Sequence, residues 1–443
     1  MSIHSKGFGP LSRRGLLQFM AVGTGAAGLA ACSSQGTANT NPSSAPSAGG
    51  QTIGSSEAKD FSFASWSISE EAAKPVITGQ LEKFGADKGI QISPVSYPFN
   101  EYLNQLTLQV RGGQFSGAMQ LDIAWLATMS ALGKLRDLSS YAEGRGYTEA
   151  GLSVGQVDGV QNGLPWTMGA IGLVANAELL QKVGADSVPS SIEDFEALLR
   201  ELKGLGNGTI PYAASTKVAQ LKDVQVWMQT FGCSLVENGE VTIGDEASIE
   251  AVTWYKKLYD EGLIGADVDR FDARSLFSQG KAAIYDDAPV GRAGVVADSP
   301  DPELASKLLP ASRPVLNSGD APRALAWGHV VAVVEGEAAD TASEFAQWLT
   351  SDEETVVAYF EALGLPPTTE EGLAADAVKS DTFIADFSER ITATAQPSPF
   401  WVYPQYGQID TAISEQVQAV LVGQSSPADA MAAAREAATA LIS

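Results

Sequence analysis

From residue 60 onward, short apolar runs that suit strands alternate with amphipathic runs that suit helices. The pattern predicts strands at 60–66, 90–97 and 121–126. Apolar residues at helical spacing predict a helix over 69–84, with Ser69 as its N-cap, and another after Asn100. This β-α-β-α-β order is typical of an α/β layer around a mostly parallel sheet.

The second half of the chain carries more helix. Residues 192–202 form one apolar face behind a predicted capping box at Ser190 and Glu193. Trp254 and Trp348 each stand among apolar neighbours at helical spacing. We therefore expect both indoles to lie in the core.

The start of the chain has the pattern of an export signal. An apolar stretch over 15–31, too short to span a bilayer comfortably, follows Arg13 and Arg14 and ends at Leu-Ala-Ala-Cys. This ending resembles the bacterial lipobox, which implies cleavage before Cys32 and lipid attachment to it. We predict a signal over 1–31 and, from its Ser, Gly and Pro content, a flexible tether over 32–58.

The export route stays open. The segment Ser-Arg-Arg-Gly-Leu-Leu-Gln at 12–18 resembles a twin-arginine signal, and an ordinary basic region before the apolar stretch explains it equally well. Either route implies the extracytoplasmic face of the bacterial cell membrane.

Charge narrows the possible partners. The chain has 28 basic and 53 acidic residues, and loss of 1–31 moves its net charge from −25 to −28, since three basic residues and no acid are removed. Such a field repels nucleic acid and anionic lipid headgroups, so we expect neither as a partner, and contact with the membrane only through the lipid. Beyond the signal only Cys233 and His329 remain besides Cys32, so neither a disulfide nor a His-rich metal site is expected, and no cofactor.

Aromatic residues end the predicted strands. Trp66, Tyr97 and Trp125 fall at or near the carboxyl ends of three of them, where ligands bind in open α/β sheets. Aromatic side chains also fill the space between a sheet and its helices, so both roles remain open.

Several segments, in this order, resemble the solute-binding proteins of ABC importers, and most closely the extracellular family 1 type that includes maltose-binding protein. The resemblance begins near Asp60. Its segments are 121–125, 133–138, 158–166, 174–180, 190–195, 277–284, 342–349 and 364–367.

This resemblance implies a two-lobed α/β fold with discontinuous lobes joined by a hinge. We place one lobe at 59–167 plus 328–366 and the other at 168–327 plus 367–443. The crossings are expected near 166–170, 326–329 and 365–368. The family also implies a monomeric receptor that captures a sugar or oligosaccharide and delivers it to the membrane-spanning subunits of an ABC permease.

The loop aromatics Trp401 and Tyr403, together with Trp327, are expected to line the cleft. Asp286 and Asp287 stand where the family usually has Gly and Trp, so they either face the ligand or lie in a solvated turn. The full set of predicted ligand-contacting residues is Trp66, Tyr97, Asp122, Trp125, Trp166, Asp286, Asp287, Arg292, Trp327, His329, Trp401 and Tyr403.

Two enzyme motifs are rejected on context. The three-glycine pattern at 23–28 lies in the signal, and the G-x-S-x-G pattern at 151–155 lacks the preceding apolar strand and following helix of a nucleophile elbow. We therefore expect no enzyme activity. A secreted carbohydrate-active hydrolase, or a binder of a polyol, peptide or polyamine, remains the alternative.

Overall fold

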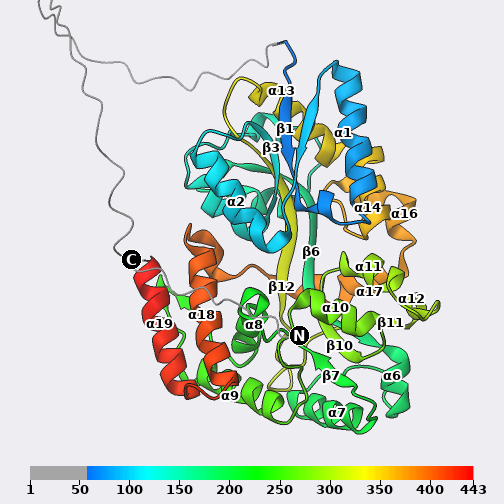
Figure 1. Cartoon of the computed structure of the whole chain (residues 1–443), viewed down its shortest axis with the longest axis vertical. Helices are drawn as coiled ribbons and strands as arrows, with labels where there is room; N and C mark the ends of the chain where they lie inside the picture. Colours follow the sequence, from blue (N-terminus) through cyan, green and yellow to red (C-terminus); the bar gives the residue numbers. More distant parts are fainter. Residues whose placement is uncertain (1–56, 443) are drawn as a thin grey trace, which may run out of the picture. The chain divides into compact units, whose positions relative to one another are not determined.

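The structure is a computed structural model that describes residues 57–442 (Figure 1). The predicted signal, Cys32 and all of the tether except its last two residues lie outside the described residues. Within 57–442, no helix is long and apolar enough to cross a membrane.

The first half of the sheet carries the early strands. Strand β1 (Phe61–Ala64) pairs in parallel with β2 (Ile92–Val95) and β3 (Gly117–Asp122), and β3 pairs antiparallel with β12 (Ala324–Val333). Alternate residues point to opposite faces of the sheet. One face packs on α1 (Lys74–Lys88), α13 (Ala339–Ser351) and α14 (Glu353–Leu363), and the other on α2 (Phe99–Arg111).

The second half of the sheet is built on β6 (Gly163–Asn176). It pairs antiparallel with β10 (Ala282–Asp287) and β11 (Leu308–Ala311), and β10 pairs in parallel with β7 (Ile210–Ala213). The largest apolar core lies on one face of this half. The helices that form it are α7 (Ile192–Gly204), α8 (Asp223–Thr230), α9 (Glu246–Asp260), α18 (Tyr406–Leu421) and α19 (Pro427–Ile442).

Strands β6 and β12 run through both halves, and residues 325–332 of β12 pair with residues 163–171 of β6 (Figure 1). The register shifts between His329 and Val330, where Trp166 is the extra residue of a bulge. The segment after α14 joins them, because the Met168 N–H donates to the Pro366 carbonyl at 3.1 Å. The three segments predicted as crossings thus lie together, and their action as a hinge, like the predicted lobe boundaries, remains a prediction.

Shorter elements complete the described chain. The helices are α3 (Leu126–Ser130), α4 (Ser139–Ala142), α5 (Glu149–Val154), α6 (Ala177–Lys182), α10 (Arg270–Ser278), α11 (Gly291–Ala297), α12 (Leu304–Lys307), α15 (Glu370–Ala374), α16 (Asp376–Lys379) and α17 (Thr382–Arg390), and the 3-10 turns are Trp66–Ser69, Ile123–Trp125, Val218–Gln220, Thr392–Thr394 and Pro399–Val402. The small strands are β4 (Gln156–Val157), β5 (Val160–Gln161), β8 (Val236–Glu237), β9 (Glu240–Val241) and β13 (Ala395–Gln396).

Three local predictions were wrong. The sheet is mixed rather than mostly parallel, because the crossing strands run antiparallel to their neighbours. The first helix begins at Lys74 instead of after Ser69, whose hydroxyl donates to the Trp66 carbonyl and ends a 3-10 turn. The third strand ends at Asp122, because the carboxylate of Asp122 accepts the Ala124 N–H and starts another 3-10 turn.

Two smaller expectations also need correction. Ser191 rather than Ser190 caps α7, with its hydroxyl accepting the Asp194 N–H. Trp348 is half-buried against Phe84, so its place in the core is only partial.

Trp254 provides the stability test. Its ring packs 4.8 Å from Trp227, and its indole N–H donates to Glu196 at 2.9 Å. Trp254→Ala should lower the free energy of unfolding by about 3–5 kcal/mol, because a large cavity is left in a dense core. Trp348→Ala should cost about half as much, since part of its ring already faces solvent. Urea denaturation of both variants measures these free energies. Equal losses of stability would contradict the placement of Trp254 in the core and of Trp348 at its edge.

Candidate ligand-binding site

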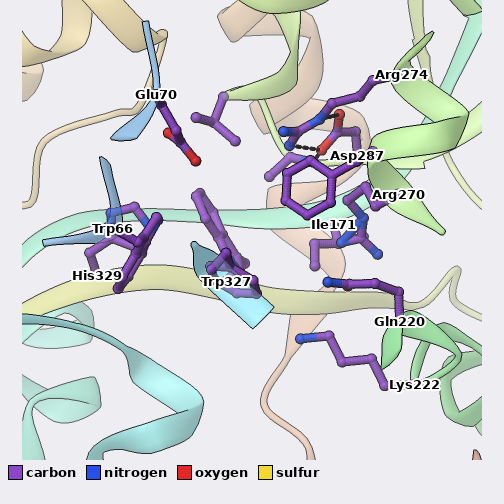
Figure 2. Close-up of a pocket in the computed structure, with 14 residues that line it drawn as sticks. Trp66, Glu70, Ile171, Gln220, Lys222, Arg270, Arg274, Asp287, Trp327 and His329 are labelled. Atoms are coloured by element: carbon purple, nitrogen blue, oxygen red, sulfur yellow. Dashed lines mark hydrogen bonds and ion pairs between the residues drawn. The ribbon is translucent and has the colours of Figure 1, made fainter. Parts of the chain in front are cut away.

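A pocket of about 50 Å³ lies where the crossing strands pass between the two halves of the sheet (Figure 2). Trp66 and His329 stand on one side, Arg270, Arg274 and Asp287 on the other, with Trp327 between them. The lining residues are Trp66, Glu70, Phe99, Ile171, Gln220, Lys222, Arg270, Phe271, Arg274, Asp287, Ala288, Val290, Trp327 and His329.

The aromatic wall is held by edge-to-face contacts. Trp66 and Trp327 lie 4.8 and 4.5 Å from the His329 ring, at steep angles to it. Trp66 also packs against Phe99 at 5.4 Å and Trp125 at 5.4 Å. Each ring is therefore fixed by several neighbours before any ligand binds.

A buried polar chain orients His329. The Gln120 amide nitrogen lies 2.9 Å from Nδ1 of His329, and the Gln120 amide oxygen accepts a hydrogen bond from Ser65. Because the amide nitrogen is a donor, Nδ1 accepts and the proton sits on Nε2. Nε2 has no hydrogen-bond partner within residues 57–442. Burial lowers the pKa of His329 to about 3, so the ring is neutral at physiological pH.

Asp122 lies beneath this wall at the end of β3. Burial raises the pKa of its carboxyl, and the charge of Lys222, the Ala124 N–H and the Trp327 indole act in the opposite direction. Its Oδ2 is buried without a hydrogen-bond partner among the described residues. Asp122 thus lies next to the Trp327 indole and attracts Lys222, the N-cap residue of α8.

The opposite wall comes from α10 and the end of β10. Arg274 donates to both oxygens of Asp287, at 2.7 and 2.8 Å, and the Ala288 N–H adds a third bond at 2.8 Å. Arg270 pairs with the buried Asp223. Burial disfavours the charge of Arg274, and the Asp287 carboxylate outweighs it, so the pKa of Arg274 is raised.

Contacts between the two halves close around the pocket. The Gln220 amide donates to Asn100 in the first turn of α2 at 3.1 Å. Glu70 faces Arg274, whose charge partly offsets the rise that burial causes in the pKa of Glu70. Outside the pocket lining, the Thr128 hydroxyl donates to the Pro404 carbonyl at 2.8 Å.

Four of the predicted residues line this pocket: Trp66, Asp287, Trp327 and His329. Asp122 and Trp125 form the layer behind it. Tyr97 bonds to Gln109 on α2, away from the lining. Their direct contact with a ligand remains a prediction.

The other predicted residues make structural contacts elsewhere. Trp166 is fully buried and stacks on Tyr359 at 4.1 Å. Arg292 pairs with Asp381 at 2.7 Å. Asp286 is buried at the end of β10 and bonds to Tyr212 and Arg313, so neither Asp286 nor Asp287 lies in a solvated turn. Trp401 and Tyr403 are half-buried and do not line the pocket.

Sequence reasoning missed the cationic side of the pocket. Arg270 and Arg274 are four residues apart, hence on one face of α10, and Lys222 is the N-cap residue of α8. Two arginines on one helix face, in a chain with only 28 basic residues, could have indicated this cationic side of the pocket. Glu70, Phe99 and Gln220 carried no local signal, because only the fold brings them to the pocket.

A larger cavity, of about 580 Å³, lies between residues 186–191 and 309–322 of the second half. No aromatic side chain lines it, and it does not touch the crossing strands. Within residues 57–442 no group of three or more potential metal ligands gathers. The smaller pocket is therefore the candidate site.

His329 gives a pH test. Between pH 6.5 and about 3 the unfolded chain protonates this ring and the folded chain does not, so the stability that His329 contributes falls as the pH is lowered. His329→Gln removes this term. Its stability relative to the wild type should rise by about 2 kcal/mol from pH 7 to pH 5. Urea denaturation of both proteins at the two pH values measures this difference, in which the titration of other groups with a raised pKa, such as Asp410, cancels. A difference that does not change with pH would contradict the buried neutral ring.

A family model described as bacterial extracellular solute-binding protein matches residues 79–385, more than half of the chain. Among curated proteins, lipoprotein LipO of Bacillus subtilis (strain 168) is 27% identical over 150 residues. That match covers 29% of this chain and 26% of LipO, so it spans about a quarter of that relative.

Solved structures share the fold over most of the chain. The GacH receptor of Streptomyces glaucescens, solved unliganded and with acarbose, has a TM-score of 0.78 at 22% identity and covers 87% of this chain and 98% of its own. MalE3 of T. maritima, bound to maltose, has a TM-score of 0.76 at 20% identity, with 86% and 98% covered. A solute-binding protein of Thermotoga lettingae, bound with α-D-tagatose, has a TM-score of 0.76 at 18% identity, with 87% and 99% covered.

These likenesses confirm the predicted two-lobed α/β fold of periplasmic binding proteins. Together with the match to the family model, they confirm the resemblance found in the sequence: this chain belongs to the bacterial extracellular solute-binding protein family.

Proposed function

We propose that this protein is a lipid-anchored receptor that captures a sugar in the pocket between its two halves and delivers it to an ABC permease. The observation that carries this proposal is the pocket itself, where the Trp66 and Trp327 indoles face charged and amide groups from the other half. Sugars present CH faces and hydroxyl rims, which aromatic plates and polar groups recognise respectively. The sugar ligands of the similar solved structures support the same class.

The charge balance of the pocket favours a neutral, hydroxyl-rich ligand. Arg274 is neutralised by Asp287 and Arg270 by Asp223. Paired charges with their positions fixed make strong hydrogen bonds to hydroxyls while offering no uncompensated charge. A polyamine would need several free carboxylates, whereas Asp286 and Asp287 are already held by arginines and Glu70 is the only other acid among the described residues that line the pocket.

Hydrolysis is less well supported than binding. A glycosidase needs two carboxyl groups free to exchange protons or attack the sugar. Asp287 has both oxygens occupied, by Arg274 and the Ala288 N–H, which leaves Glu70 without a free carboxyl partner among the residues that line the pocket. Ser153 of the G-x-S-x-G pattern lies within α5 and donates to the Ala150 carbonyl, so it does not form a nucleophile elbow.

Trp327 tests the site. Trp327→Phe keeps an aromatic ring but shortens the plate and removes the indole N–H next to Asp122. It should weaken sugar binding about tenfold, which corresponds to roughly 1.4 kcal/mol. Isothermal titration calorimetry against the tightest sugar of a panel gives the affinity.

Trp254→Phe serves as the matched control for this loss. Trp254 lies in the core of the second half and is absent from the pocket lining, so its variant should lose stability and keep its affinity. Unchanged affinity in Trp327→Phe, or an equal loss in Trp254→Phe, would refute the assignment of the pocket.

Cys32 tests the anchor. The chain has 53 acidic and 28 basic residues, so its net charge does not attract it to an anionic membrane, and we assign that role to the lipid. Cys32→Ser in the full chain should move the protein from the membrane fraction to the soluble fraction of cells, and the melting temperature should be unchanged. Complete retention in the membrane fraction would contradict lipid anchoring through Cys32.

A further inference from the structure

The pocket is narrow in the arrangement of the two halves that the structure shows. Its volume is about 50 Å³, on a scale where one water needs roughly 10–15 Å³. It therefore holds only a few waters, and every sugar must part the walls to bind. The larger the ligand, the fewer contacts between the two halves can remain when it is bound.

One end of the pocket is limited by Asn100 and Gln220. Gln220 is buried and lines the pocket, whereas Asn100 is exposed in the first turn of α2 and does not. The 3.1 Å hydrogen bond between their side chains joins the two halves. A ligand that extends past Gln220 must break this bond and leave the buried Gln220 amide without its partner.

Glu70 and Arg274 limit the other end. Figure 2 shows the Glu70 carboxylate directed across the pocket from the first half, while Gln220 and Lys222 lie at the opposite end. Arg274 cannot swing away freely, because both Asp287 oxygens hold its guanidinium. Glu70 and Arg274 form no ion pair, but a ligand that leaves the pocket here must pass between the Glu70 carboxylate and the fixed Arg274 guanidinium, whose opposite charges attract each other.

We propose that the ligand is a single-ring polyhydroxy molecule, a monosaccharide or cyclic polyol, because a second ring would have to break the bond between Asn100 and Gln220 at one end or pass between Glu70 and Arg274 at the other. This inference rests on the proposed sugar-binding function and adds a size limit to it. One ring contacts Trp66 and Trp327 and leaves the bond between Asn100 and Gln220 in place. A second ring gains surface contact only after breaking this bond at one end or moving Glu70 away from Arg274 at the other.

Calorimetric titration of the purified chain tests the limit. The panel pairs hexoses, pentoses and myo-inositol with disaccharides and trisaccharides built from the same sugars. The tightest ligand should be a single ring, bound about tenfold more tightly than its own disaccharide. In Asn100→Ala this ratio should fall to about threefold or less, because the disaccharide no longer has to break the bond to Gln220. Asn104→Ala, an exposed position on the same helix, should leave the ratio unchanged.

The outcomes of this titration distinguish the size limit from the proposed sugar-binding function. A disaccharide or trisaccharide bound more tightly than every single ring overturns the size limit and leaves sugar binding intact. Failure of every sugar and cyclic polyol to bind overturns both the size limit and the proposed function. A wild-type preference for one ring that persists in Asn100→Ala shows that the bond between Asn100 and Gln220 does not set the limit.

Discussion

The pairing of β6 with β12 is the constraint on which the candidate site depends. The two strands lie so close that a Cβ added at Gly328 would stand 2.4 Å from the Thr167 carbonyl oxygen, closer than real side chains approach. This close approach fixes the backbone on either side of Gly328. Trp327 and His329 therefore enter the pocket from a rigid strand rather than from a loop, as a preorganised site requires.

Charge is distributed around this rigid centre in pairs. A chain with nearly twice as many acids as bases places three of its cations, Lys222, Arg270 and Arg274, around one small pocket. Burying a lone cation is costly, and two of the three are compensated by a buried carboxylate, from Asp223 and Asp287 respectively. The third, Lys222, acts on the buried Asp122 through its charge alone. The two paired arginines thus give a polar wall that suits hydroxyl groups better than ions.

The sequence predicted those parts of the site that local pattern controls. Trp66 was found because it stands at the end of a predicted strand. Trp327 was grouped with the loop aromatics Trp401 and Tyr403, whereas it lies inside β12. Trp125 was placed in the ligand cleft because the third strand was expected to run to 126. The strand instead ends at Asp122, whose side chain caps a 3-10 turn and moves Trp125 into the layer behind Trp66.

The parts that the sequence did not predict depend on contacts between distant segments. Glu70 and Arg274 lie more than 200 residues apart in the chain, and Asn100 and Gln220 are separated by 120 residues. No periodicity or spacing links such pairs, since only the crossing strands bring the two halves together. Contacts between distant segments also explain why Asp286 does not line the pocket. The sequence suggested that its carboxylate could face a ligand, but Arg313 and Tyr212 donate hydrogen bonds to it in the core.

Hydrogen exchange with and without the tightest sugar most directly tests the claim that the ligand lies between the two halves. Peptides from both walls, covering 66–70, 220–222, 270–274, 287–290 and 327–329, should become protected together, because a ligand held by both halves stabilises each of them. Protection confined to one half, or to residues 186–191 and 309–322 around the larger cavity, would contradict the account and move the site elsewhere.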